Sequence, residues 1–222
     1  MKDHASHAPG APHAPRGTAA LVNGAALAEE RVDALLEVVP PRDGATRPDA
    51  FARAERQRRR WATQVVVTDE LARRACAERG LKVPDEVSPS QVLAVAEADV
   101  ADLGSIVAAA LAHSPAARVL LVALEAEQAV PEETVRDYYD RNQDLFLTPE
   151  ALRRGVDPFH GAAPGDFLPY EQTREDIARE LRRTAGRRAF FDWLDRARAG
   201  VVYAVGHEHP GDPSHPDHEH RH

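Results

Sequence analysis

The stretch FARAERQRRRWATQVVVTDELARRACAERG, residues 51–80, decides the fold class of this chain. Apolar and small residues recur in it three, four or seven positions apart and form one stripe along a helix: Phe51, Ala54, Trp61, Val65, Thr68, Ala72 and Cys76. The stripe predicts one helix of about thirty residues, far longer than the average of about 11–12. Such a helix buries its stripe against other helices, so the sequence predicts a mainly helical fold.

The composition of the whole chain agrees with this prediction. Of 222 residues 43% are hydrophobic, enough to bury a core, and only 5% are aromatic, a mixture that favours helix over strand. The net charge of −8 argues against nucleic-acid binding, which needs a basic face. A local exception is the run Arg56, Arg58, Arg59 and Arg60, which we interpret as the solvated side of the long helix, with a patch for nucleic acid or an acidic partner as the alternative.

Several features bear on the cellular compartment. Cys76 is the only cysteine, so no intramolecular disulfide can form, and its alanine neighbours favour a small core residue over a reactive thiol. The first 17 residues are rich in His, Pro and Ala and lack the apolar run of a secretory signal, and no stretch is apolar enough for a membrane span. We therefore expect a cytoplasmic protein without membrane contact, and a disordered arm over 1–17.

Helix signals divide the remainder of the chain. N-cap serines followed by proline predict helix starts at Ser88-Pro89 and Ser114-Pro115, with a further helical face between them over Leu103–Leu111. Pro131 can open the next helix, Thr148-Pro149 a short one closed by Gly155, and Gly and Pro make 155–169 a loop. A last long helix is predicted from Tyr170 to Gly200.

Two short strands are predicted at opposite ends of the helical chain. Residues 20–24 resemble a strand ended by an Asn23-Gly24 turn, with a helix directly after it, and residues 201–205 form a second apolar run. Isolated strands need a partner, so we expect these two segments to pair with each other.

The order of these elements resembles the SurA and PrsA group of parvulin-type foldases. Val22-Asn23-Gly24, with Leu27 and Val32, is similar to the opening of that group, and VPEETVRDYYDRNQDLF, residues 130–146, looks like the helix that leads into its isomerase domain. The segment 170–199 resembles the helix that returns from that domain. This chain departs from the group because only the stretch from Leu147 to Tyr170 stands where the isomerase domain would be, too little for the preorganised pocket that isomerisation needs.

The resemblance implies a SurA-like helical chaperone domain over 18–205 that binds peptides and is not an enzyme, with 147–169 as the short loop replacing the isomerase. An apolar groove between helices would hold an unfolded or precursor client protein without ATP, and the candidate peptide-binding residues are Phe51, Trp61, Val65, Tyr138, Tyr139, Phe146, Phe190 and Trp193. The alternative is that the same side chains form an ordinary core.

The residues from 206 to 222 predict a disordered tail with possible metal ligands. Carboxylates are interleaved with six histidines, His207, His209, His215, His218, His220 and His222. Imidazole and carboxylate groups together suit a borderline ion such as nickel, zinc or cobalt, although the uneven spacing does not predict a rigid site. The alternative is a solubilising tail without a metal role.

Three functions follow as hypotheses. The first is an ATP-independent chaperone or assembly factor that requires no cofactor, and the second is a nickel- or zinc-binding accessory protein for metalloenzyme maturation. The third, a degenerate isomerase with residual activity in 147–170, is weak because the sequence holds no motif of a catalytic nucleophile, nucleotide loop or HExxH metal site.

Overall fold

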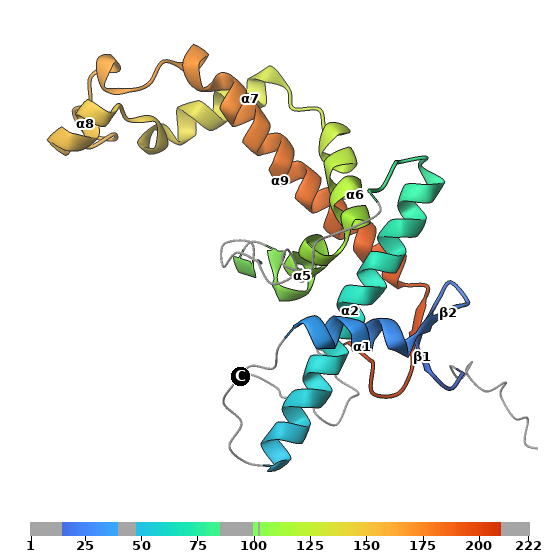
Figure 1. The fold of residues 1–222 in the computed structure, drawn as a ribbon. Helices are drawn as coiled ribbons and strands as arrows, with labels where there is room; N and C mark the ends of the chain where they lie inside the picture. The colour runs from blue at the N-terminus through green and yellow to red at the C-terminus, as the bar shows by residue number, and fades with distance from the viewer. Residues whose placement is uncertain (1–14, 40–47, 85–99, 102, 210–222) are drawn as a thin grey trace, which may run out of the picture. The chain divides into compact units, whose positions relative to one another are not determined.

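The structure is a computed structural model that describes residues 15–39, 48–84, 100, 101 and 103–209, without the side chains of 48–50. Within this part the chain is mainly helical with one small antiparallel sheet (Figure 1), as the sequence predicted. The elements are β1 (Thr18–Val22), β2 (Ala25–Ala28), α1 (Glu29–Val38), α2 (Pro48–Glu78), α5 (Ser105–His113), α6 (Pro115–Ala126), α7 (Glu132–Arg141), the 3₁₀ helix η1 (Gln143–Phe146), α8 (Pro149–Arg154), the 3₁₀ helix η2 (Pro164–Asp166), α9 (Tyr170–Arg198) and β3 (Val201–Tyr203).

The chain divides into two compact units. The first unit comprises the residues up to Leu120 and those from Trp193 onward, and the second comprises Leu121–Asp192. Both boundaries fall inside helices, α6 and α9. Helical periodicity is continuous across such a boundary, so the sequence pattern carries no sign of it.

The sheet has three strands in the order β2-β1-β3, one more than predicted. The pairing of the two terminal segments is confirmed, with Val22 opposite Val201 and Ala20 opposite Tyr203. The additional strand arises at Asn23-Gly24, where positive φ angles of 49° and 81° fold the chain back as a tight hairpin turn. The predicted helix therefore starts at Glu29 rather than directly after the turn.

Helix α2 spans 31 residues, in agreement with the helix predicted over 51–80. Its apolar side contributes Val65, Val66, Leu71, Ala72 and Cys76 to the core of the first unit. Cys76 is a buried core residue as predicted, and its Sγ lies 3.4 Å from the carbonyl oxygen of Ala116.

Two arginines of the run that we interpreted as the solvated side of the long helix do not face solvent. Arg60 is fully buried, and Arg58 donates to the carbonyl oxygens of Leu36 and Val39 at the end of α1. These carbonyls have no partner within their own helix, and a guanidinium satisfies them. The prediction of a solvated arginine face is thus wrong for these positions, because a charge run shows where arginines are but not which carbonyls they reach.

The helix signals in the second half of the chain are confirmed. Ser114 caps α6, its Oγ accepting from the N–H of Ala117 at 2.9 Å, and Thr148 caps α8 in the same way through Ala151 at 3.2 Å. Gly155, with a φ of 68°, ends α8. The helix predicted at Ser88-Pro89 lies outside the described residues.

Candidate functional site

Large apolar side chains are exposed in the short segment that connects α7 to α9. Leu145, Leu152 and Phe159 are 60%, 61% and 67% exposed, and all three fall within fifteen residues of one another. We call these three residues the exposed apolar set. Contiguous exposed apolar surface on a folded protein is commonly an interaction site, because water solvates it poorly.

A hydrogen-bonded frame carries this set. Leu147 and Phe167 form an antiparallel bridge, flanked by the bonds from Thr148 N–H to Asp166 O at 2.8 Å and from Leu168 N–H to Phe146 O at 2.7 Å. An ion pair between Arg154 and Asp166 ties the end of α8 to η2. The segment 147–169 is therefore organised, with a short helix and a β-bridge, and carries Leu152 and Phe159, while Leu145 lies in η1 directly before it.

A cluster of aromatic rings packs next to this hydrogen-bonded frame and is bonded to it through Tyr139 and Leu168. Phe146 lies 4.9 Å from the ring centre of Tyr139 and 6.4 Å from that of Tyr138, while Tyr170 meets Tyr139 edge-on at 5.5 Å. The hydroxyl of Tyr139 donates to the carbonyl oxygen of Leu168 at 2.6 Å. Edge and tilted ring pairs of this kind stabilise by about 0.5–1.5 kcal/mol beyond the area they bury.

Glu132, at the start of α7, joins this cluster to α9. One carboxylate oxygen accepts from the hydroxyl of Tyr170 at 2.5 Å and the other from Arg174 at 3.1 Å, and Arg136 lies 4.7 Å from the centre of the Tyr170 ring. Burial, together with the adjacent carboxylate, raises the pKa of Tyr170 to about 12. The tyrosine is therefore a neutral hydrogen-bond donor at any ordinary pH.

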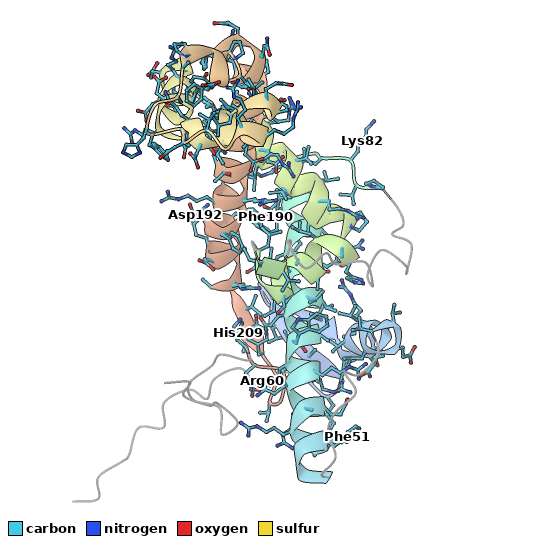
Figure 2. The ribbon with its side chains drawn as sticks, turned by 90° about the vertical axis from the view of Figure 1, so that its left-hand side faces the viewer. Phe51, Arg60, Lys82, Phe190, Asp192 and His209 are labelled. Atoms are coloured by element: carbon cyan, nitrogen blue, oxygen red, sulfur yellow. The ribbon has the colours of Figure 1, made fainter. Side chains whose placement is uncertain are left out.

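The eight candidate peptide-binding residues have different environments. Val65 and Phe190 are buried and so are not at the surface, whereas Trp61, Trp193, Tyr138, Tyr139 and Phe146 are half-buried. Phe51 is exposed at the N-terminal end of α2 (Figure 2). The structure brings Tyr138, Tyr139 and Phe146 together, in the aromatic cluster of the second unit.

Sequence reasoning missed the exposed apolar set. Leu145, Leu152 and Phe159 stand seven positions apart, which is a helical spacing, but Pro149, Gly155 and Pro158 interrupt the stretch. The three residues therefore lie in η1, in α8 and in the loop after it rather than on one helix face, and their spacing gave no sign that they would be exposed.

In the first unit the notable feature is polar. Five polar or charged residues of α2 are buried between positions 60 and 69, namely Arg60, Thr63, Gln64, Thr68 and Asp69. Three of them bind β3 or the chain that follows it. Arg60 donates to the carbonyl oxygens of Glu208 and His209 (Figure 2), Gln64 accepts from the Tyr203 hydroxyl at 2.9 Å, and Thr63 Oγ1 lies 2.8 Å from Nδ1 of His207.

Residues 206–209, predicted as the beginning of a disordered tail, therefore pack on α2. His207 is buried, and burial lowers its pKa despite the nearby carboxylate of Glu29, so the neutral imidazole is favoured. The physical reason for the difference from the prediction is that a local run of His, Gly and Pro gives no indication of buried donors on a distant helix. His215, His218, His220 and His222 lie outside the described residues.

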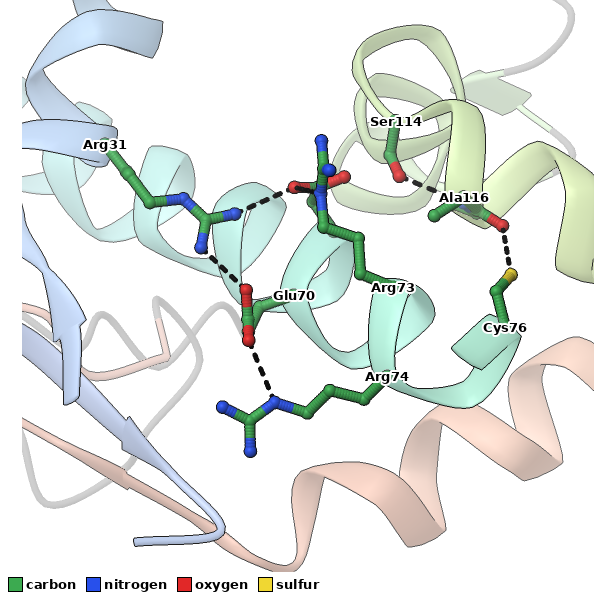
Figure 3. A network of polar contacts seen from close by, with 9 residues as sticks. Arg31, Glu70, Arg73, Arg74, Cys76, Ser114 and Ala116 are labelled. Atoms are coloured by element: carbon green, nitrogen blue, oxygen red, sulfur yellow. Dashed lines mark hydrogen bonds and ion pairs between the residues drawn. The ribbon is translucent and has the colours of Figure 1, made fainter. Parts of the chain in front are cut away.

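Asp69 and Glu70, at the C-terminal end of this stretch of buried polar residues, bind arginines (Figure 3). Arg31 of α1 donates to both carboxylates, at 2.8 Å and 2.7 Å, and Arg73 and Arg74 complete the network one turn further along α2. Burial alone would raise the pKa of Glu70, but the hydrogen bonds from Arg31 and Arg74 outweigh it and hold the pKa below its usual value. The network ties α1 to α2.

Thr63, His207 and Glu29 follow the order nucleophile, base, carboxylate, but their bonding does not suit catalysis. The hydroxyl of Thr63 donates to the carbonyl oxygen of Arg59 at 2.9 Å and is fully buried. A nucleophile must donate its proton to the base and reach the substrate, and Thr63 does neither. Among the described residues, no group of three or more His, Cys, Asp or Glu side chains is arranged to hold a metal ion.

No single described helix has the length and hydropathy needed to cross a membrane; only α5 and α6 taken together, bent by 105° between them, pass that test. Comparison with models of known protein families, with curated proteins and with solved structures finds no match. Membership of the SurA and PrsA group is therefore a prediction from the sequence alone, which these comparisons do not test.

Proposed function

We propose that this protein is an ATP-independent chaperone or assembly factor that binds apolar segments of unfolded or precursor proteins and has no prolyl isomerase activity. The observation that carries the proposal is the exposed apolar set, Leu145, Leu152 and Phe159, on its hydrogen-bonded frame. This set lies between α7 and α9, where the related foldases would carry their isomerase domain. In this proposal the segment between α7 and α9 binds clients, whereas the foldases have a catalytic domain at that position.

The physical basis of such binding is the removal of apolar surface from water. Burying a Leu or Phe side chain fully gains about 1.5–3 kcal/mol, and three partly buried ones suffice for a weak, reversible complex. Because the frame orders these side chains beforehand, little conformational entropy is lost when a client binds. Binding to the unfolded form alone then lowers the concentration of aggregating chains by mass action and needs no ATP.

The test is a triple substitution with a matched control. The variant Leu145→Ser, Leu152→Ser, Phe159→Ser removes the exposed apolar set, and the control Val100→Ser, Val202→Thr, Val205→Ser removes exposed apolar residues of the first unit. Binding of a permanently unfolded, labelled polypeptide is measured by fluorescence anisotropy. We expect the first variant to bind at least about tenfold more weakly, equivalent to 1.4 kcal/mol, and the control to bind as the unchanged protein does. Equal binding by all three proteins would refute the proposal.

A second candidate function, a metal-binding accessory protein, has an observation of its own. Arg60 and Gln64 hold the backbone of 207–209 on α2, so the histidine-bearing sequence from His209 to His222 continues from a fixed point. Such anchoring favours a tail that delivers its ions near the body over a purely solubilising one. Equilibrium dialysis against nickel and zinc, with and without residues 210–222, tests it, and this function fails if the full chain retains neither ion.

A further inference from the structure

We propose that the exposed apolar set binds client segments that are cationic as well as apolar, with Lys or Arg close in sequence to their apolar residues. This inference rests on the proposed function and deepens it by naming the chemical class of the client. The observation that carries it is the distribution of charge around the set, in residues 132–168, which comprise α7 and most of the connection to α9.

Carboxylates outnumber arginines in this segment by two to one. Residues 132–168 hold eight Asp and Glu residues, four Arg and no Lys, a net charge of −4 out of the −8 of the whole chain. The excess is local, because residues 174–188 of α9 hold six Arg against three Asp and Glu. The negative charge of the second unit is therefore concentrated in the segment that carries the exposed apolar set.

The arginines of this segment do not cancel the excess, because each is already paired with a carboxylate of the same segment. The pairs are Arg136–Asp140, Arg141–Asp137, Arg153–Glu150 and Arg154–Asp166. Of the other four carboxylates, Glu132 is bonded to Tyr170 and Arg174. Among the described residues, no arginine or lysine pairs with the remaining three, Glu133, Asp144 and Asp157.

Two of these three carboxylates stand beside members of the exposed apolar set. Asp144 is exposed and directly precedes Leu145. Asp157 is exposed as well, and one of its oxygens accepts from the N–H of Phe159 at 2.9 Å, while the other lies 3.0 Å from Nδ1 of His160. These hydrogen bonds hold the carboxylate next to the exposed phenylalanine. The set therefore presents apolar surface and negative charge together.

A Lys or Arg side chain fits both properties. Its aliphatic stem packs on apolar surface while its charged end stays in water. The ring of Phe159, 67% exposed, attracts such a cation to its face, and Asp157 can form a surface ion pair with it. Contacts of these kinds each strengthen binding about two- to fivefold. An acidic client would instead bring like charges together, so the same groups discriminate against it.

The experiment measures the binding of three labelled peptides to the full chain by fluorescence anisotropy. The peptides share the same Leu and Phe residues and carry Arg, Gln or Glu at the positions between them. We expect the Arg peptide to bind about tenfold more tightly than the Gln peptide, and the Glu peptide more weakly than both. Because the carboxylates are exposed, high salt should reduce the advantage of the Arg peptide through screening.

Two double variants separate these carboxylates from the overall charge of the protein. Asp144→Asn with Asp157→Asn removes the charge beside the exposed apolar set, and asparagine at 157 can still accept from the N–H of Phe159. The matched control, Asp176→Asn with Glu180→Gln, changes the net charge equally at exposed positions of α9. We expect the first variant to bind the Arg peptide no better than the Gln peptide, and the control to keep the preference.

Three results would contradict the inference. Equal binding of the Arg and Gln peptides by the unchanged protein would overturn it while the proposed function stands. A preference that both double variants keep, or that both lose equally, would show that Asp144 and Asp157 do not determine it, and would overturn it too. If the unchanged protein binds none of the three peptides, the proposed function fails and the inference fails with it.

Discussion

The two units of this protein differ in the polar groups that they bury. In the first unit Arg60, Thr63, Gln64 and Asp69 are buried and bonded, whereas the second unit exposes Leu145, Leu152 and Phe159 on an ordered frame. Exposed apolar side chains also occur in the first unit, at Val202 and Val205. Buried polar groups stabilise a fold only when their partners are placed accurately, so the first unit is specified by its hydrogen bonds. Exposed apolar side chains contribute little to stability, and our proposed function assigns those of the second unit to client binding.

The largest expected difference between the units is in the loss of unfolding free energy when one leucine of each is replaced by alanine. Leu120 of the first unit is fully buried, and Leu120→Ala should cost about 2–5 kcal/mol of unfolding free energy through lost contacts and a cavity. Leu152→Ala in the second unit should cost no more than about 0.5 kcal/mol. Urea denaturation followed by circular dichroism measures both. A large loss for Leu152→Ala would show that the exposed set is structural and would break the comparison.

The second expected difference is in the loss of unfolding free energy when one ion-paired aspartate of each unit is removed. Asp69 accepts from Arg31 and Arg73 and is almost completely buried, so Asp69→Ala should cost about 2–3 kcal/mol, the range for hydrogen bonds between charged partners. In the second unit, Asp137 pairs with Arg141 at the surface, and Asp137→Ala should cost no more than about 0.5 kcal/mol. The same denaturation experiment compares them. Equal losses would mean that the buried network does not stabilise the first unit.

A third prediction concerns packing within the second unit. A Cβ atom at Gly186 of α9 would lie 2.3 Å from Cγ and 2.7 Å from Cα of Glu125 of α6, so these two helices can approach only because residue 186 is glycine. Gly186→Ala should therefore destabilise by about 1–3 kcal/mol through overpacking, although alanine favours helix. Gly165→Ala, where a Cβ meets open space, is the control. Stabilisation by Gly186→Ala would show that the helices are further apart.

The smallest expected effect is a dependence on alkaline pH. The pKa of Tyr170 is about 12 in the folded protein and 10 in the unfolded chain, so its contribution to stability is complete below pH 10 and is lost as the pH rises through about 12. Phenolate absorbance at rising pH measures this pKa. The variant Glu132→Gln should bring it closer to 10, and a titration that Glu132→Gln leaves unchanged would separate the tyrosine from the carboxylate.

Local signals in the sequence predicted most of the elements. The stripe from Phe51 to Cys76 predicted α2, and the Ser114 and Thr148 caps predicted the starts of α6 and α8. The third strand was missed because four residues are too few to show a period of two, and only the geometry of the Asn23-Gly24 turn reveals it.

The candidate site was less predictable. The sequence predicted Tyr138, Tyr139 and Phe146 as three of eight candidate binding residues, and these three pack as one cluster. Val65 and Phe190 are buried, in agreement with the alternative of an ordinary core for these positions. An apolar residue in a helical stripe has the same signature whether it faces a core or a groove. The docking of His207 on Thr63 joins residues far apart in the chain, and nothing in the local pattern near His207 could predict it.

The position of β1 has a consequence for the order in which the protein is made. As the central strand of the sheet it pairs on one side with β2, its immediate neighbour in sequence, and on the other with β3, which follows every described helix. A ribosome adds about 5–20 residues per second, so for roughly 9–35 seconds, while residues 29–200 are added, the nascent chain holds a hairpin with one edge unpaired. The protein thus passes through an incomplete stage during its own synthesis, and its closing strand is among the last of the described residues to be synthesised.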